Sequence, residues 1–146
     1  IDKAASDNIW GGTNLSSAAT IGDSAAQYTV IRKTSSAIQE QSLFSVPVSG
    51  IRKGLYSLLI RLKASQNTDG NGLVRLKVSS GSVVQKQRTI IAQMFKSANT
   101  YQTFGMNVEL DDSATISAAL LKNSANITIS IDYVILQSAQ TAITSL

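Results

Sequence analysis

The sequence contains no cysteine and no histidine, and this restricts the chemistry that the chain can perform. Without these residues there is no Ser-His-Asp triad, no cysteine nucleophile and no imidazole base. The usual ligands of a zinc site are missing, and no disulfide can form. Enzymes that depend on these groups are therefore excluded, and cysteine usage gives no information about the compartment.

Long apolar runs, proline and glutamate are also scarce. No run approaches the roughly 18 residues of a membrane-spanning helix, so we expect no membrane insertion. Glutamate occurs only at Glu40 and Glu109, whereas serine and threonine together make up 33 of the 146 residues. Hydroxyl side chains compete with the helix backbone, and threonine prefers pleated surfaces. This composition favours an all-β domain, and its length suits one domain with its own core.

Basic residues are concentrated in the middle of the chain. Between Arg32 and Lys96 lie eleven basic and two acidic residues, whereas the remainder holds two basic and seven acidic residues. Two interpretations stay open: ordinary solvated strand faces, or a basic face for an anionic partner such as a phosphorylated glycan. Nucleic acid is not the expected partner, because no ladder of aromatic residues is interleaved with the basic ones.

Alternation of apolar and polar residues predicts about eight strands separated by turn-forming residues. The clearest are residues 54–64, 101–110 and 127–135. In residues 54–64, Tyr56 and Ile60 face inward, and Arg61 and Lys63 face outward. In residues 127–135 the expected inward set is Ile127, Ile129, Ile131, Tyr133 and Ile135. The pattern predicts a single antiparallel β-sandwich over residues 25–146, preceded by an N-terminal arm or linker over residues 1–24. We expect the chain to be part of a larger polypeptide.

Three stretches resemble the carbohydrate-binding-module-like jelly rolls. Residues 44–50 with residues 54–64 resemble a strand, a turn and a strand that opens on Gly-x-Tyr. Residues 101–104 resemble the entry to a late strand, and residues 131–136 resemble a closing strand of the form Asp-Tyr-Val-x-Leu. Such modules accompany glycan-active enzymes and occur in tail, baseplate and receptor-binding proteins of bacteriophages.

The resemblance implies a jelly-roll β-sandwich that binds cell-surface or polymeric carbohydrate without catalysis. Its most specific implication is the host-adhesion domain of a phage tail or baseplate protein. The partner would be a bacterial cell-wall or surface polysaccharide, and the domain would be extracellular, on the virion. No cofactor is expected.

Some of these families hold a structural calcium between an acidic pair and the aspartate of the closing strand. Residues 25–28 contain no acid here, and Asp132 alone cannot supply the several oxygen ligands that calcium needs. No metal site is therefore expected. Asp132 is then interpreted as a solvent-facing or hydrogen-bonded strand residue.

The candidate ligand-binding residues are polar groups expected on the outer face of one concave sheet. Arg61 and Lys63 on one strand and Arg75 and Lys77 on the next would form a basic cluster. Arginine presents a planar fork of donors that suits vicinal hydroxyls, carboxylates and phosphates. The remaining candidates are Tyr101, Asn107, Glu109 and Trp10. An outward Arg61 would contact the ligand and contribute little to stability.

Several of these assignments have alternatives. Ordinary surface charge explains the basic residues equally well. Trp10 is expected in a glycine-flanked loop, where it would cap the sandwich, line a ligand site or anchor the arm on a neighbour. Tyr56, Phe104 and Tyr133 are expected in the core.

Two other functions are alternatives to glycan binding. An enzyme without histidine or cysteine would need paired carboxylates. Only Glu109 and Asp132 lie on predicted strands, so we expect no enzyme. The second alternative is a trimeric structural or receptor-binding head of a viral fibre, in which the small-residue arm wraps around a neighbour. The sequence does not distinguish a monomeric module from a homotrimer.

Overall fold

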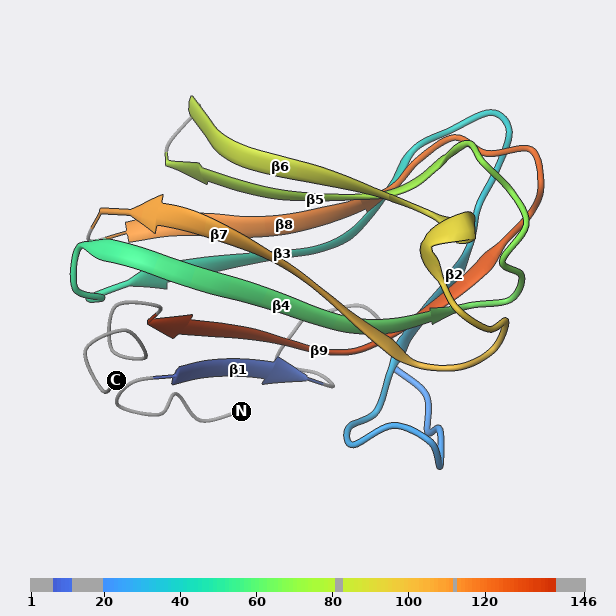
Figure 1. The fold of residues 1–146 in the computed structure, drawn as a ribbon, viewed down its shortest axis with the longest axis horizontal. Helices are drawn as coiled ribbons and strands as arrows, with labels where there is room; N and C mark the ends of the chain where they lie inside the picture. Colours follow the sequence, from blue (N-terminus) through green and yellow to red (C-terminus); the bar gives the residue numbers. More distant parts are fainter. Residues whose placement is uncertain (1–6, 12–19, 81–82, 112, 139–146) are drawn as a thin grey trace.

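The computed structural model describes residues 7–11, 20–80, 83–111 and 113–138. Almost all regular structure in these residues is extended, and the strands form two antiparallel sheets packed face to face (Figure 1). In chain order the elements are β1 (Asp7–Gly11), β2 (Ile31–Thr34), β3 (Gln41–Ser49), β4 (Gly54–Ala64), β5 (Gly72–Ser80), β6 (Val83–Ile91), the short 3-10 helix η2 (Ala92–Met94), β7 (Gln102–Leu110), β8 (Ser113–Leu120) and β9 (Thr128–Ser138). The predicted β-sandwich is confirmed. None of the described segments is a helix that could span a membrane.

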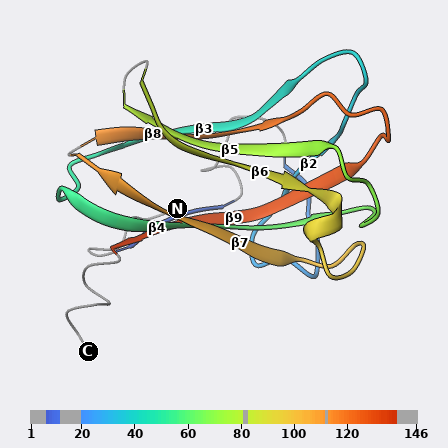
Figure 2. The same cartoon turned by 45° about the horizontal axis from the view of Figure 1, so that its top comes forward.

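The two sheets draw their strands from distant parts of the sequence. The five-stranded sheet has the order β1-β9-β4-β7, and β2 also pairs with β9. The four-stranded sheet has the order β3-β8-β5-β6. Figure 2 shows the two layers from a second direction. Consecutive strands β4 and β5 therefore belong to different sheets, and this decides where the candidate site residues lie.

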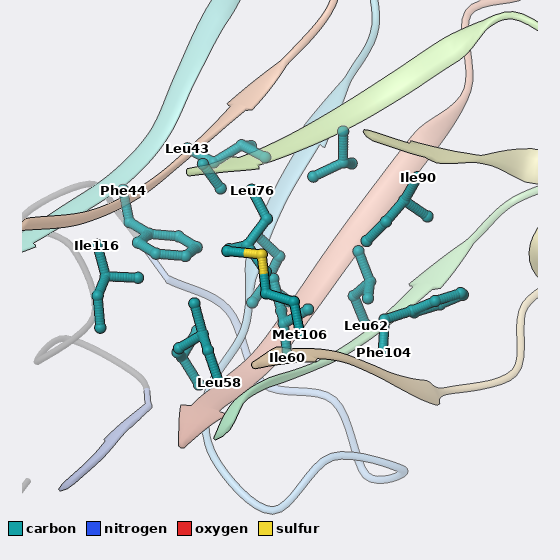
Figure 3. Packing of buried hydrophobic residues seen from close by; sticks show 14 of the residues in the cluster. Leu43, Phe44, Leu58, Ile60, Leu62, Leu76, Ile90, Phe104, Met106 and Ile116 are labelled. Carbon is teal, nitrogen blue, oxygen red and sulfur yellow. The ribbon is translucent and has the colours of Figure 1, made fainter. Parts of the chain in front are cut away.

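The core fills the space between the sheets, because each strand directs alternate side chains inward. On β4, Tyr56, Leu58, Ile60 and Leu62 are all buried, as predicted. Leu76 from β5 and the side chains of Phe104 and Met106 from β7 meet them from the other strands (Figure 3). Burial of each large apolar side chain contributes roughly 1.5–3 kcal/mol.

A bulge in β9 changes which of its side chains face the core. The pairing with β4 passes from Leu62 opposite Ile131 to Arg61 opposite Tyr133, so Asp132 has no partner in the register. One extra residue on a strand reverses the faces of all later residues. Beyond Ile131 the predicted inward set is therefore wrong. The inward side chains are Val134 and Leu136, whereas Tyr133 and Ile135 are half-buried on the outer face.

Strand β1 lies within the segment expected to be an arm. Its five residues pair with Tyr133–Gln137 of β9. Trp10 is therefore in a strand, in register with Val134, and the expected loop placement is wrong. A Cβ atom added at Gly11 would lie 2.5 Å from the ring of Tyr28, so glycine allows this close approach. Tyr28 in turn packs edge-on against Tyr133, with ring centroids 6.1 Å apart.

The edge strands β6 and β7 are joined by side chains across the gap between the sheets. Arg88 and Lys86 pair in register with Leu76 and Val78, which face the core, so these basic side chains point toward the other sheet. Arg88 donates a hydrogen bond of 2.6 Å to the carbonyl oxygen of Gly105, and the Lys86 ammonium donates to that of Asn107. The outer edge of β7 is therefore partly satisfied by basic side chains rather than by another strand.

Candidate functional site

The two basic pairs predicted to cluster lie on different sheets. Arg61 and Lys63 are on the outer side of β4, in the five-stranded sheet. Arg75 and Lys77 are on the outer side of β5, in the four-stranded sheet. The expectation of one basic cluster is wrong, because β4 and β5 do not pair. Each pair has its own surroundings.

On the five-stranded sheet, Asp23 is the centre of a charged cluster. Its carboxylate accepts from the Lys63 ammonium at 2.8 Å, from the Arg32 guanidinium at 3.1 Å and from the Tyr101 hydroxyl at 2.9 Å. The backbone N–H of Ala25 donates to it at 3.0 Å. The Asp23 side chain is only 10% exposed. Lys63 and Tyr101 are therefore already engaged by the protein itself.

Asp132 binds residues 27 and 28, which lie shortly after Asp23 in the chain. It is fully buried, and its carboxylate accepts from the backbone N–H groups of Gln27 and Tyr28 at 3.0 Å each. The Arg61 guanidinium forms an ion pair with it and also donates to the carbonyl of Ala25 at 3.4 Å. The expectation that an outward Arg61 is free for a ligand does not fit these contacts. Asp132 is a buried, hydrogen-bonded residue, as one of the two interpretations held.

Tyr101 contacts the Asp23 carboxylate directly and also contacts Arg61, the cation that pairs with Asp132. Its ring lies under two cations, with the Arg61 guanidinium carbon 4.6 Å and the Lys63 nitrogen 5.0 Å from the ring centroid. Such contacts contribute roughly 0.5–2 kcal/mol each. Burial, together with the hydrogen bond to the Asp23 carboxylate, raises the pKa of Tyr101 well above its ordinary value. Tyr101 therefore remains a protonated donor, and the cluster fastens residues 23–28 to the outer face of the sheet.

The contacts of Asp23 predict a pH-dependent contribution to stability. Its hydrogen bond from Lys63, with those from Ala25 and Tyr101, holds its pKa well below the ordinary value of 3.8. A carboxylate whose pKa is lower in the folded state than in the unfolded state stabilises the fold at pH values above the unfolded-state pKa. This stabilisation is lost as the pH falls from the unfolded-state pKa through the folded-state pKa. We expect Asp23→Asn to destabilise the protein most near pH 7, with the difference from wild type shrinking below about pH 4.

Urea unfolding between pH 2 and pH 7 measures this dependence. Asp111→Asn is the control, because it makes the same change in formal charge at a side chain that is 65% exposed. A destabilisation by Asp23→Asn that stays constant over the whole pH range would contradict the ionic role of Asp23.

The residues near Asp132 do not fit a calcium site. Both carboxylate oxygens of Asp132 already accept hydrogen bonds, and Arg61 places a positive charge beside them. Calcium takes six to eight oxygen ligands, most of them carboxylates or carbonyls. Within the described ranges no three acidic side chains come together in a way that could hold a metal ion. No step of the function is therefore assigned to calcium.

The outer face of the four-stranded sheet carries a groove of about 270 Å³. Two rows of side chains cross three strands there: Lys77, Ser117 and Ser45 form one, and Arg75, Ala119 and Ser42 form the other. The central strand β8 and its neighbour β3 contribute only short side chains to this floor, whereas the long side chains of the lining are Arg75, Lys77 and Glu40. The lining consists of Glu40, Ser42, Ser45, Arg75, Lys77, Ser117, Ala118 and Ala119.

The two basic residues of the groove differ in their partners. Arg75 donates to the Glu40 carboxylate at 2.8 Å, and the two side chains are 29% and 45% exposed. Lys77 is half-buried and has neither a hydrogen bond nor an ion pair with the described residues. The groove therefore offers serine hydroxyls, one ion pair at its end and one ammonium group without a partner.

The other candidates lie on the outer side of β7 and in β1. Asn107 is exposed and accepts a hydrogen bond of 2.7 Å from the Ser57 hydroxyl. Glu109 lines a second hollow of about 260 Å³, together with Lys53 and Asp111. The structure describes the backbone of Trp10 but not its side chain. Asn107 and Glu109 thus lie on the opposite sheet from Arg75 and Lys77, and the candidates do not form one site.

Several residues that shape these surfaces were not expected from the sequence. Asp23 lies far in the chain from Lys63 and Tyr101, and nothing local marks these two pairings. Ser45 and Ser117 gain their importance only from the strand order. The one available signal was the alternate small residues Ser113, Thr115, Ser117 and Ala119, because short outward side chains on a central strand produce a hollow.

Solved structures with the same fold include carbohydrate-binding modules. No protein-family model and no curated protein matches the sequence. A family 35 carbohydrate-binding module from Clostridium thermocellum superposes with a TM-score of 0.60 at 14% identity, covering 90% of this chain and 98% of that one. The module CBM36, solved with calcium and xylotriose, gives 0.52 at 12% identity, covering 89% and 99%.

The same fold also occurs in a protein with a different description. The insecticidal crystal protein CRY2AA superposes with a TM-score of 0.60 at 10% identity, covering 96% of this chain but 22% of that one. At these identities the likeness establishes the fold alone. The function must be argued from the surfaces of this chain.

Proposed function

We propose that this chain is a non-catalytic carbohydrate-binding domain whose ligand lies in the groove across β3, β8 and β5. The observation that carries the proposal is the pair of cross-strand rows that end on Lys77 and Arg75. A shallow trough with a low floor, hydroxyl groups and planar or charged donors suits an extended polar polymer. The carbohydrate-binding modules among the structures of the same fold support the same ligand class.

Three carboxylates that already have partners within the protein support binding without catalysis. Glycoside hydrolysis ordinarily needs two carboxyl groups that face the substrate. Asp23 and Asp132 instead accept hydrogen bonds from the protein, and Glu40 binds Arg75. These carboxylates thus act as partners for cations and backbone donors.

We further propose that the domain serves host adhesion in a phage tail or baseplate protein, outside the cell. Support for this setting comes from the sequence resemblance of residues 44–64, 101–104 and 131–136 to such modules. A bacterial surface polysaccharide is then the natural ligand.

Filling the groove is expected to weaken binding. Ser117→Leu places a bulky side chain on the central strand, between Lys77 and Ser45. We expect at least about tenfold weaker binding, equivalent to about 1.4 kcal/mol. The melting temperature should change little, because surface substitutions on strands usually cost under about 0.5 kcal/mol. The measurement is binding of the tagged domain to a panel of bacterial wall polysaccharides and plant polysaccharides, neutral and acidic.

Thr103→Leu is the matched control, because it adds the same side chain to the exposed outer face of β7 in the other sheet. It should leave binding unchanged. Equal binding by wild type and Ser117→Leu would remove the groove from the function. Absence of binding to every polysaccharide would contradict glycan recognition, and a stable trimer in that case would favour an assembly role.

A further inference from the structure

Among the described residues, Lys77 and Arg75 are the two cations that line the groove, and they differ in their partners. They stand two residues apart on β5, so both point out of the same face of the sheet. Lys77 has no polar partner among the described residues, whereas Arg75 is held by Glu40 at 2.8 Å. A partly desolvated ammonium without a partner gains from the arrival of an anion.

We propose that the groove selects glycans that carry an acidic group, and that Glu40 is a built-in competitor for that group. This inference rests on the proposed glycan-binding function. The ligand's carboxylate or phosphate binds the Lys77 ammonium and takes the place of Glu40 on the Arg75 guanidinium. Glu40 is the more exposed member of its ion pair, at 45%, so its carboxylate can return to water when it is displaced.

The floor of the groove explains why a sugar, rather than any anion, would bind there. Ser117 and Ser45 continue the row that begins at Lys77, and Ser42 continues the row that begins at Arg75. Cross-strand neighbours stand about 4.5–5.5 Å apart, a spacing close to the length of one sugar ring. The acidic group would lie over β5, and the hydroxyls of the same or the next sugar would lie over β8 and β3.

Charge at the opposite sheet does not provide an equivalent site. Arg61, Lys63 and Arg32 also lie on an outer face, but each is bound to Asp23 or Asp132. An anion there would compete with carboxylates that are at most 10% exposed and hold backbone N–H groups as well. In the groove, by contrast, a ligand anion replaces only one exposed carboxylate, that of Glu40.

Two substitutions of opposite expected effect test this inference. The probes are polygalacturonate, its carboxyl-reduced form, a ribitol-phosphate wall polymer, and polyglutamate as an acidic polymer without sugar. We expect wild type to bind one of the acidic sugar polymers at least tenfold more tightly than carboxyl-reduced polygalacturonate or polyglutamate. Lys77→Ala should weaken that binding at least tenfold, and Glu40→Gln should strengthen it several-fold because Arg75 becomes free.

The matched controls change charge elsewhere by the same amount. Lys53→Ala and Asp111→Asn remove charges from side chains that are 83% and 65% exposed, and both should leave binding within twofold of wild type. The polymer bound identifies whether the acidic group is a carboxylate or a phosphate.

Other results would overturn the inference while leaving the proposed function intact. These are binding of neutral polysaccharides with no preference for acidic ones, or weaker binding by Glu40→Gln. Equal binding of polyglutamate would overturn it by showing unspecific attraction. No binding to any polysaccharide, neutral ones included, would instead contradict the proposed function itself.

Discussion

Replacing Asp132 with alanine is expected to lower the free energy of unfolding by about 2–4 kcal/mol, because it removes one side of a buried ion pair. The substitution also leaves the backbone N–H groups of Gln27 and Tyr28 without an acceptor. Arg61 would remain without its carboxylate partner, with its side chain 26% exposed. Because of this partial exposure, the expected loss in free energy of unfolding is smaller than for a fully buried unpaired cation. Urea unfolding at neutral pH measures the loss.

A second substitution separates the ion pair from the backbone contacts. In Asp132→Asn the side-chain oxygen can still accept from one backbone N–H, whereas the negative charge beside Arg61 is absent. Asp132→Asn should therefore be destabilised less than Asp132→Ala. Asp111→Ala, at an exposed position, should cost under about 0.5 kcal/mol. A similarly small loss in Asp132→Ala would show that Asp132 does not hold residues 25–28 on the sheet.

The second large effect is expected at Leu76, which is fully buried on β5 between β8 and β6. Leu76→Ala removes most of a side chain from the middle of the core and should cost about 2–5 kcal/mol. Chemical denaturation measures the cost. Arg75 and Lys77 point to the other face of the same strand, so the folded variant should keep the affinity of the groove.

Conservative replacement at the same position is the internal control. Leu76→Met keeps the volume nearly constant and should cost under about 1.5 kcal/mol. Ser79→Ala, on the outer face two residues beyond Lys77, should be close to neutral. A loss of affinity in folded Leu76→Ala would mean that the groove depends on core packing as well as on its own side chains.

Local alternation predicted the strands well, because a strand with one face in the core alternates apolar and polar residues along its own sequence. The expected strand over residues 54–64 matches β4 at both ends, and its inward set is correct. Alternation fails where the chain adds a residue. At the bulge the Asp132 carboxylate contacts Arg61 and the backbone N–H groups of Gln27 and Tyr28, and none of these contacts is visible in the local pattern of β9.

The candidate site was predicted less well, because it depends on which strands become neighbours. The outward parity of Arg61, Lys63, Arg75 and Lys77 is correct. Their grouping is not, since the chain passes from one sheet to the other between β4 and β5. Strand order is a property of long-range packing. The strand order places Ser45, Ser117 and Lys77 in one row, although these residues are far apart in the sequence.

The contacts between β6 and β7 have a consequence for how copies of this domain behave when they are crowded. An uncovered strand edge invites another chain to add to the sheet, which is a common start of aggregation. Here Lys86 and Arg88 occupy carbonyl oxygens of β7 at Asn107 and Gly105, and they also bring positive charge to that edge. A second molecule would have to displace both basic side chains before it could extend the sheet. The β7 edge is thus protected against strand addition by a neighbouring copy.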